Sequence, residues 1–412
     1  MGIPIAYSLG LSAFCYFSII HPELLPVLPQ RLFAGMNSYA MIALPLFITM
    51  GLLMNKGGIT SRLIDFSMLF VRRFRGGLGA VNVLASMIFG GISGSSVSDT
   101  ASTGAVLIPE MKDRGYTAEF ASGITVASST MGMILPPSVP MVIYALVAEE
   151  SVGKLFLGSA IPGIMIGLIM LEIIMAISYW QNYPREEVSL STKEQFVRVR
   201  KSILAIIMPV FVVGSVVFGI ATATESAGVG ILYALIIGLF VTRGLKLQNI
   251  PPVLKSAIIT SATVMIIIAL SQMYVRILAI ERIPEAVALF VTSLNLPGVL
   301  IFLCIDIIIL LTGTFVDVSP AILLLTPVFL SAAQALGISS VQFGAILITG
   351  LAIGLVTPSV GMCLNAGSAI SRLSIGRIFK ASIPFLLANI ITLVLITLLP
   401  PLSLWLPGLL MK

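Results

Sequence analysis

The chain has 412 residues, of which 58% are hydrophobic and 10% charged, with a net charge of +6 and a mean hydropathy of +1.11. A soluble globule of this composition could not present a wettable surface. Three scattered cysteines and a single histidine indicate neither a disulfide framework nor a zinc site. Several charge-free stretches, such as 120–148 and 318–371, exceed the roughly 20 residues that cross a bilayer as helix. The sequence therefore predicts an all-α polytopic membrane protein.

The apolar and amphipathic segments predict a series of elements in chain order. The first half, residues 1–180, is expected to contain scaffold helices at 2–20 and 36–54, an arm helix at 58–75, a re-entrant hairpin at 77–110, a broken helix at 118–149 and a helix at 157–180. A cytoplasmic linker follows at 181–201. The second half, residues 202–412, is expected to contain scaffold helices at 202–220, 226–242 and 256–275, an arm helix at 281–295, a hairpin at 298–336, a broken helix at 340–370 and a helix at 383–405.

A short polar motif occurs twice within apolar surroundings. Gly94-Ser95-Ser96-Val97-Ser98-Asp99 resembles Gly313-Thr314-Phe315-Val316-Asp317, and the two acids are 218 positions apart (317 − 99). Further positions match at 222, namely Gly132 and Pro136 with Gly354 and Pro358. The spacing between matching positions thus changes by only four residues (222 − 218), which favours two copies of one unit.

Counting spans from these motifs places 18 of the 23 Lys and Arg on one side, which the positive-inside rule makes cytoplasmic. The same count predicts that the two repeats have inverted topology. In this register helix 202–220 has no counterpart ahead of Met1. We expect either that one N-terminal helix is missing or lies on another segment, or that the halves are genuinely asymmetric.

The repeated motifs are predicted to be hairpin tips that open half-helices at membrane depth. Ser96-x-x-Asp99 and Thr314-x-x-Asp317 have the pattern of capping boxes, and the free N–H groups of such ends attract carboxylates. Unpaired carbonyls of 90–95 and 312–313, with nearby hydroxyls, are expected to form oxygen cages suited to Na+. Two interpretations of the acids stay open, capping alone or direct contact with ions, protons or substrate.

Two other features have alternative interpretations. The glycine clusters could be helix-packing contacts, but their recurrence in both halves favours broken helices. Glu172 and Asp306 stand alone in apolar runs, where buried hydrogen bonding between helices is the expected role.

Four motifs in order resemble the large membrane subunit of tripartite ATP-independent periplasmic (TRAP) transporters, over nearly the whole chain. They are Gly91-Ile92-Ser93-Gly94-Ser95-Ser96, Pro136-Pro137-Ser138, Thr222-x-Thr224-Glu225-x-Ala227 and Gly354-Leu355-Val356-Thr357-Pro358. The resemblance implies a non-enzymatic, Na+-coupled elevator of the ion transporter superfamily in the bacterial inner membrane. It also implies a small four-helix membrane subunit (Q-type), separate or fused, and a periplasmic substrate-binding protein (P-type). The chain departs from the family pattern at Ala223 and Ser359, where proline is usual.

The sequence therefore predicts Na+-driven uptake of a carboxylate such as a sialic acid, another sugar acid or a C4-dicarboxylate, with no transition metal. The expected Na+ ligands form two groups, Ser93, Gly94, Ser95, Ser96, Gly132, Pro136 and Pro137 in one and Thr312, Gly313, Thr314, Gly354, Val356, Thr357 and Ser359 in the other. The expected substrate contacts are Ser95, Asp99, Thr103, Thr314, Asp317, Val360 and Asn365.

Two rival functions belong to other classes. A stand-alone Na+- or proton-coupled anion carrier of the same superfamily would share the hairpins but transport without a binding protein. An intramembrane aspartyl protease would also place two acids in the membrane, but it needs a Gly-x-Gly-Asp element, which neither tip supplies.

Overall fold

The computed structural model describes residues 5–37, 39–71, 75–183, 192–294 and 296–411, and these residues form helices joined by short connections. Parts of five expected segments, 2–4, 38, 72–74, 184–191 and 295, lie outside the described residues. Within the described part, six helices are long and apolar enough to cross a membrane, or seven if one bent pair counts as a span. The all-α polytopic class predicted from composition is confirmed.

The first half contains two 3-10 helices and ten α-helices. In order they are α1 (Ile5–Ile20), η1 (Pro22–Val27), α2 (Leu28–Met36), η2 (Tyr39–Ile42), α3 (Ala43–Lys56), α4 (Ile59–Val71), α5 (Gly77–Ser93), α6 (Ser96–Asp113), α7 (Ala118–Ser128), α8 (Met131–Ile134), α9 (Val139–Val147) and α10 (Val152–Trp180). The break after α8 bends the apolar segment Ala118–Ile134 by 41° relative to α9.

The second half continues the order of hairpin, broken helix and final helices. Its elements are α11 (Thr192–Val217), α12 (Ala223–Ile236), η3 (Ile237–Val241), η4 (Leu247–Asn249), α13 (Ile250–Ile280), α14 (Ile283–Ser293), α15 (Gly298–Phe315), α16 (Val318–Ala335), α17 (Ser340–Gly354), α18 (Met362–Ser371), α19 (Ile375–Leu398) and α20 (Pro401–Leu410). Helices α6 and α16 begin 222 residues apart (318 − 96), as do α7 and α17 (340 − 118). The inversion of the two units stays a prediction.

Some helix boundaries differ from the predicted ranges. Helix α2 was not predicted, and the helix expected at 36–54 begins only at Ala43. Helix α11 begins at Thr192, inside the expected linker 181–201. Helix α13 extends past Lys255 and Arg276, where the predicted range stopped, because charged side chains near the ends of a spanning helix can reach the interface.

The helix expected at 383–405 is two helices. Helix α19 begins earlier, at Ile375, and α20 begins at Pro401. Pro400 and Pro401 follow directly on Leu399, and a residue before proline is disfavoured in the helical conformation. Leu399 accordingly leaves the helix with φ −121° and ψ 85°.

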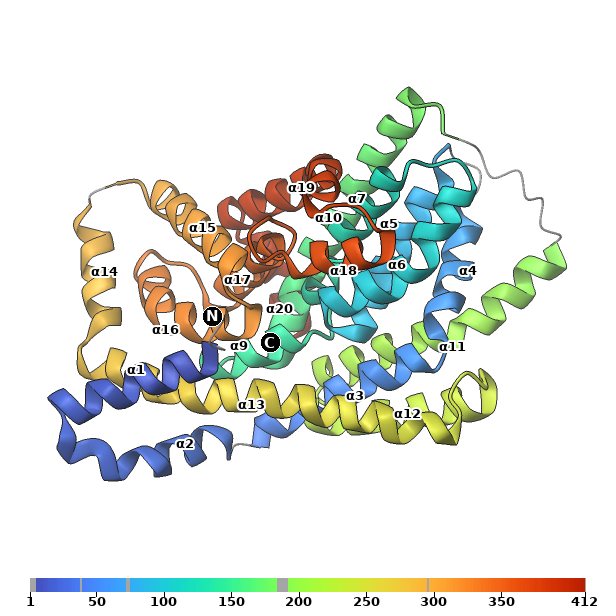
Figure 1. Ribbon diagram of the computed structural model, residues 1–412. Coiled ribbons are helices and arrows are strands. Elements are labelled where there is room, and N and C mark those ends of the chain that lie inside the picture. Colours follow the sequence, from blue (N-terminus) through green and yellow to red (C-terminus); the bar gives the residue numbers. More distant parts are fainter. Residues whose placement is uncertain (1–4, 38, 72–74, 184–191, 295, 412) are drawn as a thin grey trace.

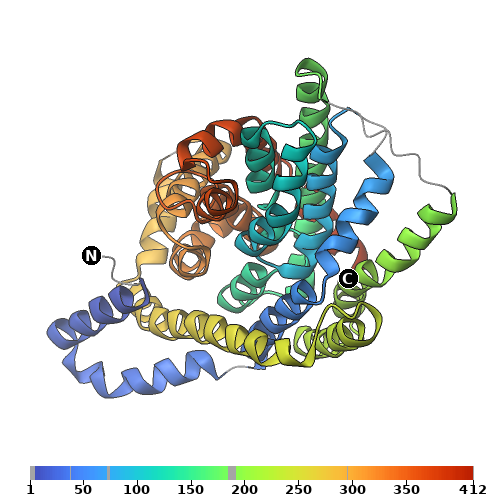
Figure 2. The ribbon, with the colours of Figure 1, turned by 45° about the vertical axis from the view of Figure 1, so that its right-hand side comes forward.

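The helices form an outer frame beside a central bundle. Helix α13 runs along one side of the molecule and packs against α1, α2 and α3, while α12 also packs on α3 (Figure 1). The arm helices α14 and α4 stand at opposite ends and contact the two hairpins, α14 through α16 and α4 through α5. Figure 2 shows the same frame wrapping the bundle of α5–α10 and α15–α20 from a second direction. We term α1–α4 and α11–α14 the frame, and the remaining helices the centre.

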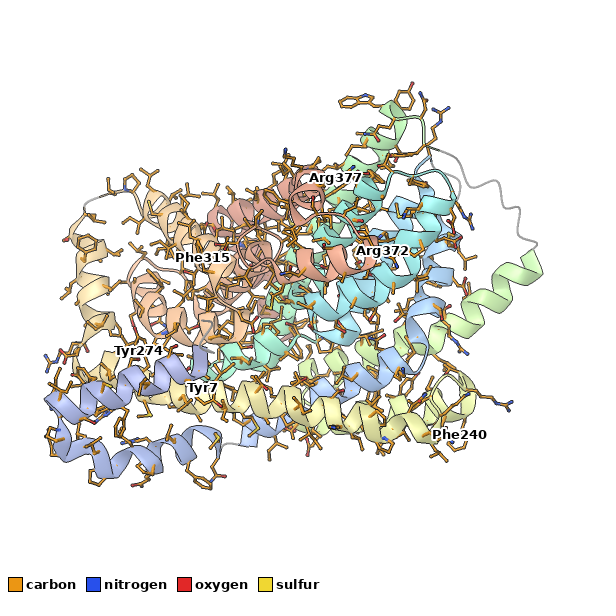
Figure 3. The ribbon with its side chains drawn as sticks, in the orientation of Figure 1. Tyr7, Phe240, Tyr274, Phe315, Arg372 and Arg377 are labelled. Carbon is orange, nitrogen blue, oxygen red and sulfur yellow. The ribbon has the colours of Figure 1, made fainter. Side chains whose placement is uncertain are left out.

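The frame exposes large apolar side chains to its surroundings. Tyr7 on α1 is 60% exposed and Phe240 on η3 is 72% exposed (Figure 3). Soluble monomers rarely expose broad apolar surfaces of this kind, whereas lipid tails accept them. The outer surface of the frame is therefore apolar, as expected of a protein that lies in a bilayer.

Candidate functional site

The first hairpin turns at residues 93–99, termed the first tip. Gly94 ends α5 in the left-handed conformation, with φ 61° and ψ 17°, a geometry that glycine adopts without steric cost. This turn leaves Ser95 extended, and its hydroxyl accepts from the Ser98 N–H at 3.5 Å. Ser95 is therefore the N-cap of α6. The predicted capping box of Ser96 and Asp99 is wrong by one residue, because the left-handed turn lies at Gly94.

Asp99 lies one turn inside α6 and is fully buried. The Ser93 hydroxyl donates to Asp99 Oδ1, while Oδ2 has no hydrogen-bond partner among the described residues. Oδ2 faces Gly132, since a Cβ added to Gly132 would lie 2.1 Å from it. An unpaired carboxylate oxygen in such surroundings is costly unless a cation or proton accompanies it. The structure thus places this unpaired oxygen where the first tip meets the facing break.

The second hairpin turns at residues 312–318, termed the second tip, and its geometry differs. Helix α15 continues through Thr314 to the exposed Phe315 (Figure 3), and the Thr314 hydroxyl donates to the Leu311 carbonyl at 2.7 Å. Asp317 is itself the N-cap of α16 and accepts from the Val318 N–H at 2.8 Å. The predicted capping box of Thr314 and Asp317 is therefore wrong, because Thr314 belongs to the preceding helix.

These caps also correct the register of the repeat at the tips. The N-caps Ser95 and Asp317 lie 222 positions apart (317 − 95), the offset of the glycine and proline matches. At this offset the counterpart of Asp99 is Ala321, which is fully buried. The match of the two acids at 218 is thus a displaced coincidence, and only the first half has an acid one turn inside its half-helix.

Each tip contacts one break, and we term residues 129–138 the first break and 355–361 the second. The Ser96 hydroxyl donates across to the Thr130 carbonyl at 3.5 Å, and an added Cβ on Gly91 would lie 3.0 Å from the Pro136 carbonyl oxygen. Gly94 comes equally close to the Pro137 carbonyl, at 3.2 Å for an added Cβ. These contacts bring the expected first group of ligands together.

The second tip and second break are joined through backbone. A Cβ on Gly354 would lie 2.3 Å from the Gly313 carbonyl carbon, so only glycine permits this approach. The Thr314 carbonyl accepts from the Ser359 hydroxyl at 2.8 Å and from the Val360 N–H at 3.2 Å. The serine that departs from the family pattern is therefore used to hold the tip.

Three of the carbonyls expected to be unpaired, those of Gly90, Ser95 and Thr312, accept backbone hydrogen bonds. Gly90 accepts from the Gly94 N–H at 3.2 Å and Thr312 accepts from the Val316 N–H at 2.9 Å. The helices continue closer to each tip than expected, so the backbone N–H groups at the helix ends donate hydrogen bonds to these carbonyl oxygens. The Thr357 hydroxyl likewise donates to the Ile353 carbonyl at 3.0 Å, while Val356 is buried beside it. Each oxygen keeps a second lone pair for a cation.

Both tips open into one cavity of about 500 Å³ between the centre and the frame. Its described lining residues are Ile48, Gly51, Leu52, Ser93, Gly94, Ser95, Ser96, Val97, Ser98, Ala101, Met133, Val139, Pro140, Thr260, Val264, Asp317, Val318, Ser319, Leu355 and Met362. Within this set Asp317 carries the charge, and no Lys, Arg or His is present. The cavity is therefore apolar with hydroxyl groups concentrated at the tips.

The structure divides the predicted substrate residues. Ser95 and Asp317 line the cavity. Asp99 and Thr103 are fully buried and linked to each other, since the Thr103 hydroxyl donates to the Asp99 carbonyl at 2.6 Å. The remaining three, Thr314, Val360 and Asn365, do not line the cavity; the Asn365 amide donates to the Val360 carbonyl at 2.6 Å. Those five positions were predicted by closeness to the motifs, which does not fix which face of a helix they occupy.

Sequence reasoning missed the part of the wall that the frame supplies. Gly51 of α3 lies against the first tip, where an added Cβ would be 3.1 Å from the Ser93 carbonyl oxygen. Thr260 and Val264 of α13 complete this side. Gly51 interrupts an apolar helix and was the available signal, whereas Thr260 has no distinguishing neighbours in the sequence.

A helical membrane protein with two hairpins, two broken helices and a cavity at their tips belongs to the class of secondary transporter permeases. The chain matches the family described as tripartite ATP-independent periplasmic transporter, DctM component, over residues 1–402. The chain therefore belongs to this family, whose members are transporter permeases and not enzymes, and it is a multi-pass protein of the bacterial inner membrane.

Individual relatives differ in the substrate that they are named for. The C4-dicarboxylate TRAP transporter large permease protein DctM of Pseudomonas aeruginosa is 35% identical over 401 residues, 97% of this chain and 94% of that protein. The sialic acid TRAP transporter large permease protein SiaM of Vibrio cholerae is 34% identical over 411 residues, 99% of this chain and 95% of that protein. The solved YdaH transporter of Alcanivorax borkumensis shares the fold, with a TM-score of 0.66 at 13% identity and coverage of 93% and 91% of the two chains.

Proposed function

We propose that this chain imports an organic acid by a Na+-driven elevator mechanism, together with a small four-helix membrane subunit and a periplasmic substrate-binding protein. Membership of the TRAP family supports the class of transporter and the kind of partners. The observation that carries the Na+ step is the buried Asp99 carboxylate, whose Oδ2 faces Gly132. A hard cation suits this oxygen, the nearby backbone carbonyls and the tip hydroxyls.

Coupling follows from where this cation would lie. Asp99 sits behind Ser95, and Ser95 lines the cavity as the N-cap of α6. A cation at Asp99 would hold the first tip against the first break and fix the N–H groups at the start of α6. Substrate would then meet a preformed end, so binding of the ion and of the substrate would favour each other.

The charges around the cavity suggest how the substrate is oriented. We place its carboxylate at the α6 end, where free N–H groups and the positive helix dipole meet. The α16 end is capped by the carboxylate of Asp317, so it would accept hydrogen bonds from substrate hydroxyls and repel a second carboxylate. This arrangement favours a polyhydroxylated sugar acid over a C4-dicarboxylate.

The elevator step has a physical basis in the wall of the cavity. Helices α3 and α13 of the frame contribute Gly51, Thr260 and Val264, while the tips and breaks of the centre supply the rest. If the centre slides along the frame, the substrate keeps its contacts with both tips and exchanges only the frame contacts. The surface between frame and centre is where this sliding would occur.

Uptake by proteoliposomes containing the chain and its small subunit, with a panel of candidate binding proteins, tests the proposal. Imposed Na+ and K+ gradients of equal size should give rapid uptake only with Na+. Uptake at full rate without Na+ would disprove the coupling. Equal uptake with and without the binding protein would favour the stand-alone carrier, and faster uptake of a C4-dicarboxylate than of any sugar acid would disprove the orientation.

A further inference from the structure

A second buried acid lies away from the tips, on the entering arm of the second hairpin. Asp306 is near the middle of α15 and only 4% exposed. Its Oδ2 lies 2.9 Å from the hydroxyl oxygen of Thr397, close to the end of α19. This contact confirms the expectation that Asp306 is a buried partner between helices.

The hydrogen-bond inventory around Asp306 fits the neutral acid better than the carboxylate. The Thr397 hydroxyl oxygen is also 2.9 Å from the Leu393 carbonyl, yet a hydroxyl has a single proton to donate. A neutral Asp306 can donate its own proton to Thr397, which then donates to Leu393, and both contacts are satisfied. An ionised Asp306 would compete with Leu393 for the Thr397 proton.

The second oxygen leads to the same conclusion. Asp306 Oδ1 is buried and has no hydrogen-bond partner in the described part of the chain. If the acid is neutral, Oδ1 is a carbonyl oxygen, and leaving it without a hydrogen bond costs little free energy. If the acid is ionised, Oδ1 carries negative charge that no described neighbour solvates.

The helices that pack against α15 supply no compensating charge. These helices are α16, α17 and α19. The first two contain no titratable side chain. Helix α19 carries Arg377 and Lys380, but Lys380 is 17 residues before Thr397 (397 − 380), roughly 25 Å along the helix. Asp317 lies beyond the end of α15 at Phe315, which is nine residues from Asp306 (315 − 306), roughly 13 Å along the helix. On α15 itself the other titratable group is the exposed Cys304.

We infer that Asp306 is a proton-binding site, and that its bound proton fastens the hairpin arm α15 to α19. When the proton leaves to water, Thr397 must turn from the Leu393 carbonyl toward the carboxylate, and the buried negative charge, with Oδ1 still unpaired, destabilises the packing of the two helices. The second hairpin carries Asp317 at its tip, so this fastening also steadies one wall of the cavity. The inference does not rest on the proposed Na+ coupling, because it concerns a different acid and a different ion.

Infrared spectroscopy of the full chain in liposomes tests for the bound proton without any substrate. The wild-type minus Asp306→Asn spectrum at pH 7 should contain one carboxylic acid C=O band. Thr397→Val should shift this band, because the hydrogen bond is lost. Thr392→Val, a matched change of a buried threonine on the same helix that lacks a hydrogen-bond partner in the described structure, should leave it in place. A difference spectrum with no carboxylic acid band would overturn the inference.

Uptake as a function of pH tests the fastening. An asparagine amide copies the hydrogen bonding of the neutral acid, so Asp306→Asn should transport within about threefold of wild type at pH 7. Between pH 7 and pH 9, at constant Na+, wild-type uptake should fall at least about threefold more than uptake by Asp306→Asn. Identical pH profiles, or a folded Asp306→Asn protein without transport, would show that the proton does not fasten the arm.

Discussion

The two hairpin tips have similar sequences but place their acids in different surroundings. In the first tip, Asp99 is fully buried behind the N-cap Ser95, with one oxygen facing Gly132. In the second tip, Asp317 is itself the N-cap and lines the cavity. In the corrected register the two helices end at equivalent positions, Ser93 and Phe315 (315 − 93 = 222), so the difference arises from where each acid stands, four residues beyond the N-cap in the first tip and at the N-cap in the second. One acid therefore faces the interior of the protein and the other faces the cavity.

The contacts between tip and break differ in the same sense. The first tip meets its break through the Asp99 side chain, which abuts Gly132, in addition to the backbone contacts of Gly91 and Gly94. The second meets its break through backbone, since Gly313 abuts Gly354 and the Thr314 carbonyl is held by Ser359. The two halves thus differ, with a carboxylate packed against the break in one and a close glycine-to-glycine backbone contact in the other.

Replacing Gly354 and Gly132 by alanine should give the largest effects on stability and on Na+ activation, and should distinguish the backbone contact of the second tip from the carboxylate contact of the first. In Gly354→Ala the new Cβ would meet the Gly313 backbone at 2.3 Å, which no side-chain rotation can relieve. We expect a loss of about 3 kcal/mol in stability or of the folded protein. In Gly132→Ala the Cβ would displace Asp99 Oδ2, and Na+ activation should fall about 100-fold in a protein that still folds.

Gly228→Ala is the matched control, because nothing lies within 4 Å of its added Cβ. Thermal unfolding in detergent and Na+ titration of uptake measure the two effects. If Gly132→Ala shows the same Na+ activation as wild type, Asp99 is not a ligand of the ion.

The helical class and the closeness of tips and breaks could be predicted because both depend on local patterns. Long apolar runs fix spanning helices, and Gly and Pro clusters such as 354–358 mark broken ones. The roles of Asp99 and Asp317 could not be predicted, because a shift of the turn by a few residues decides whether an acid caps a helix or lies inside it. Thr260 was missed for another reason. Its place in the cavity comes from the crossing of α13 over the tips, which no pattern within α13 encodes.

Neutralising the two acids in turn should separate the ion from the substrate. Asp99→Asn removes the charge that would hold Na+, so the Na+ concentration for half-maximal uptake should rise about 100-fold. Asp317→Asn keeps an N-cap of similar quality and loses one strong acceptor, so KM for a sugar acid should rise about fivefold with Na+ dependence unchanged. Steady-state uptake at varied Na+ and varied substrate measures both. Equal effects of the two substitutions on Na+ dependence would contradict the division of roles.

A smaller effect should come from the serines of the two breaks, which are matched in chemistry but not in contacts. The Ser359 hydroxyl donates across to the second tip at Thr314, at 2.8 Å. The Ser138 hydroxyl donates within its own break, to the Met133 carbonyl at 2.5 Å. Each change to alanine should cost about 1 kcal/mol in stability. Only Ser359→Ala should also loosen the second tip and raise the half-saturating Na+ concentration, by about threefold.

Measuring both stability and the Na+ titration of uptake in Ser359→Ala and Ser138→Ala shows whether the Ser359 hydrogen bond affects ion binding or only folding. A residue whose bond affects ion binding is called a latch. If Ser359 is a latch, Ser359→Ala and Ser138→Ala lose similar stability but differ in Na+ dependence. Restoring the hydroxyl with Ser359→Thr should recover the wild-type Na+ response, because threonine also donates a hydrogen bond. If both alanine variants keep the wild-type Na+ response, the bond from Ser359 to Thr314 serves folding alone, and the departure from the usual proline has no part in ion binding.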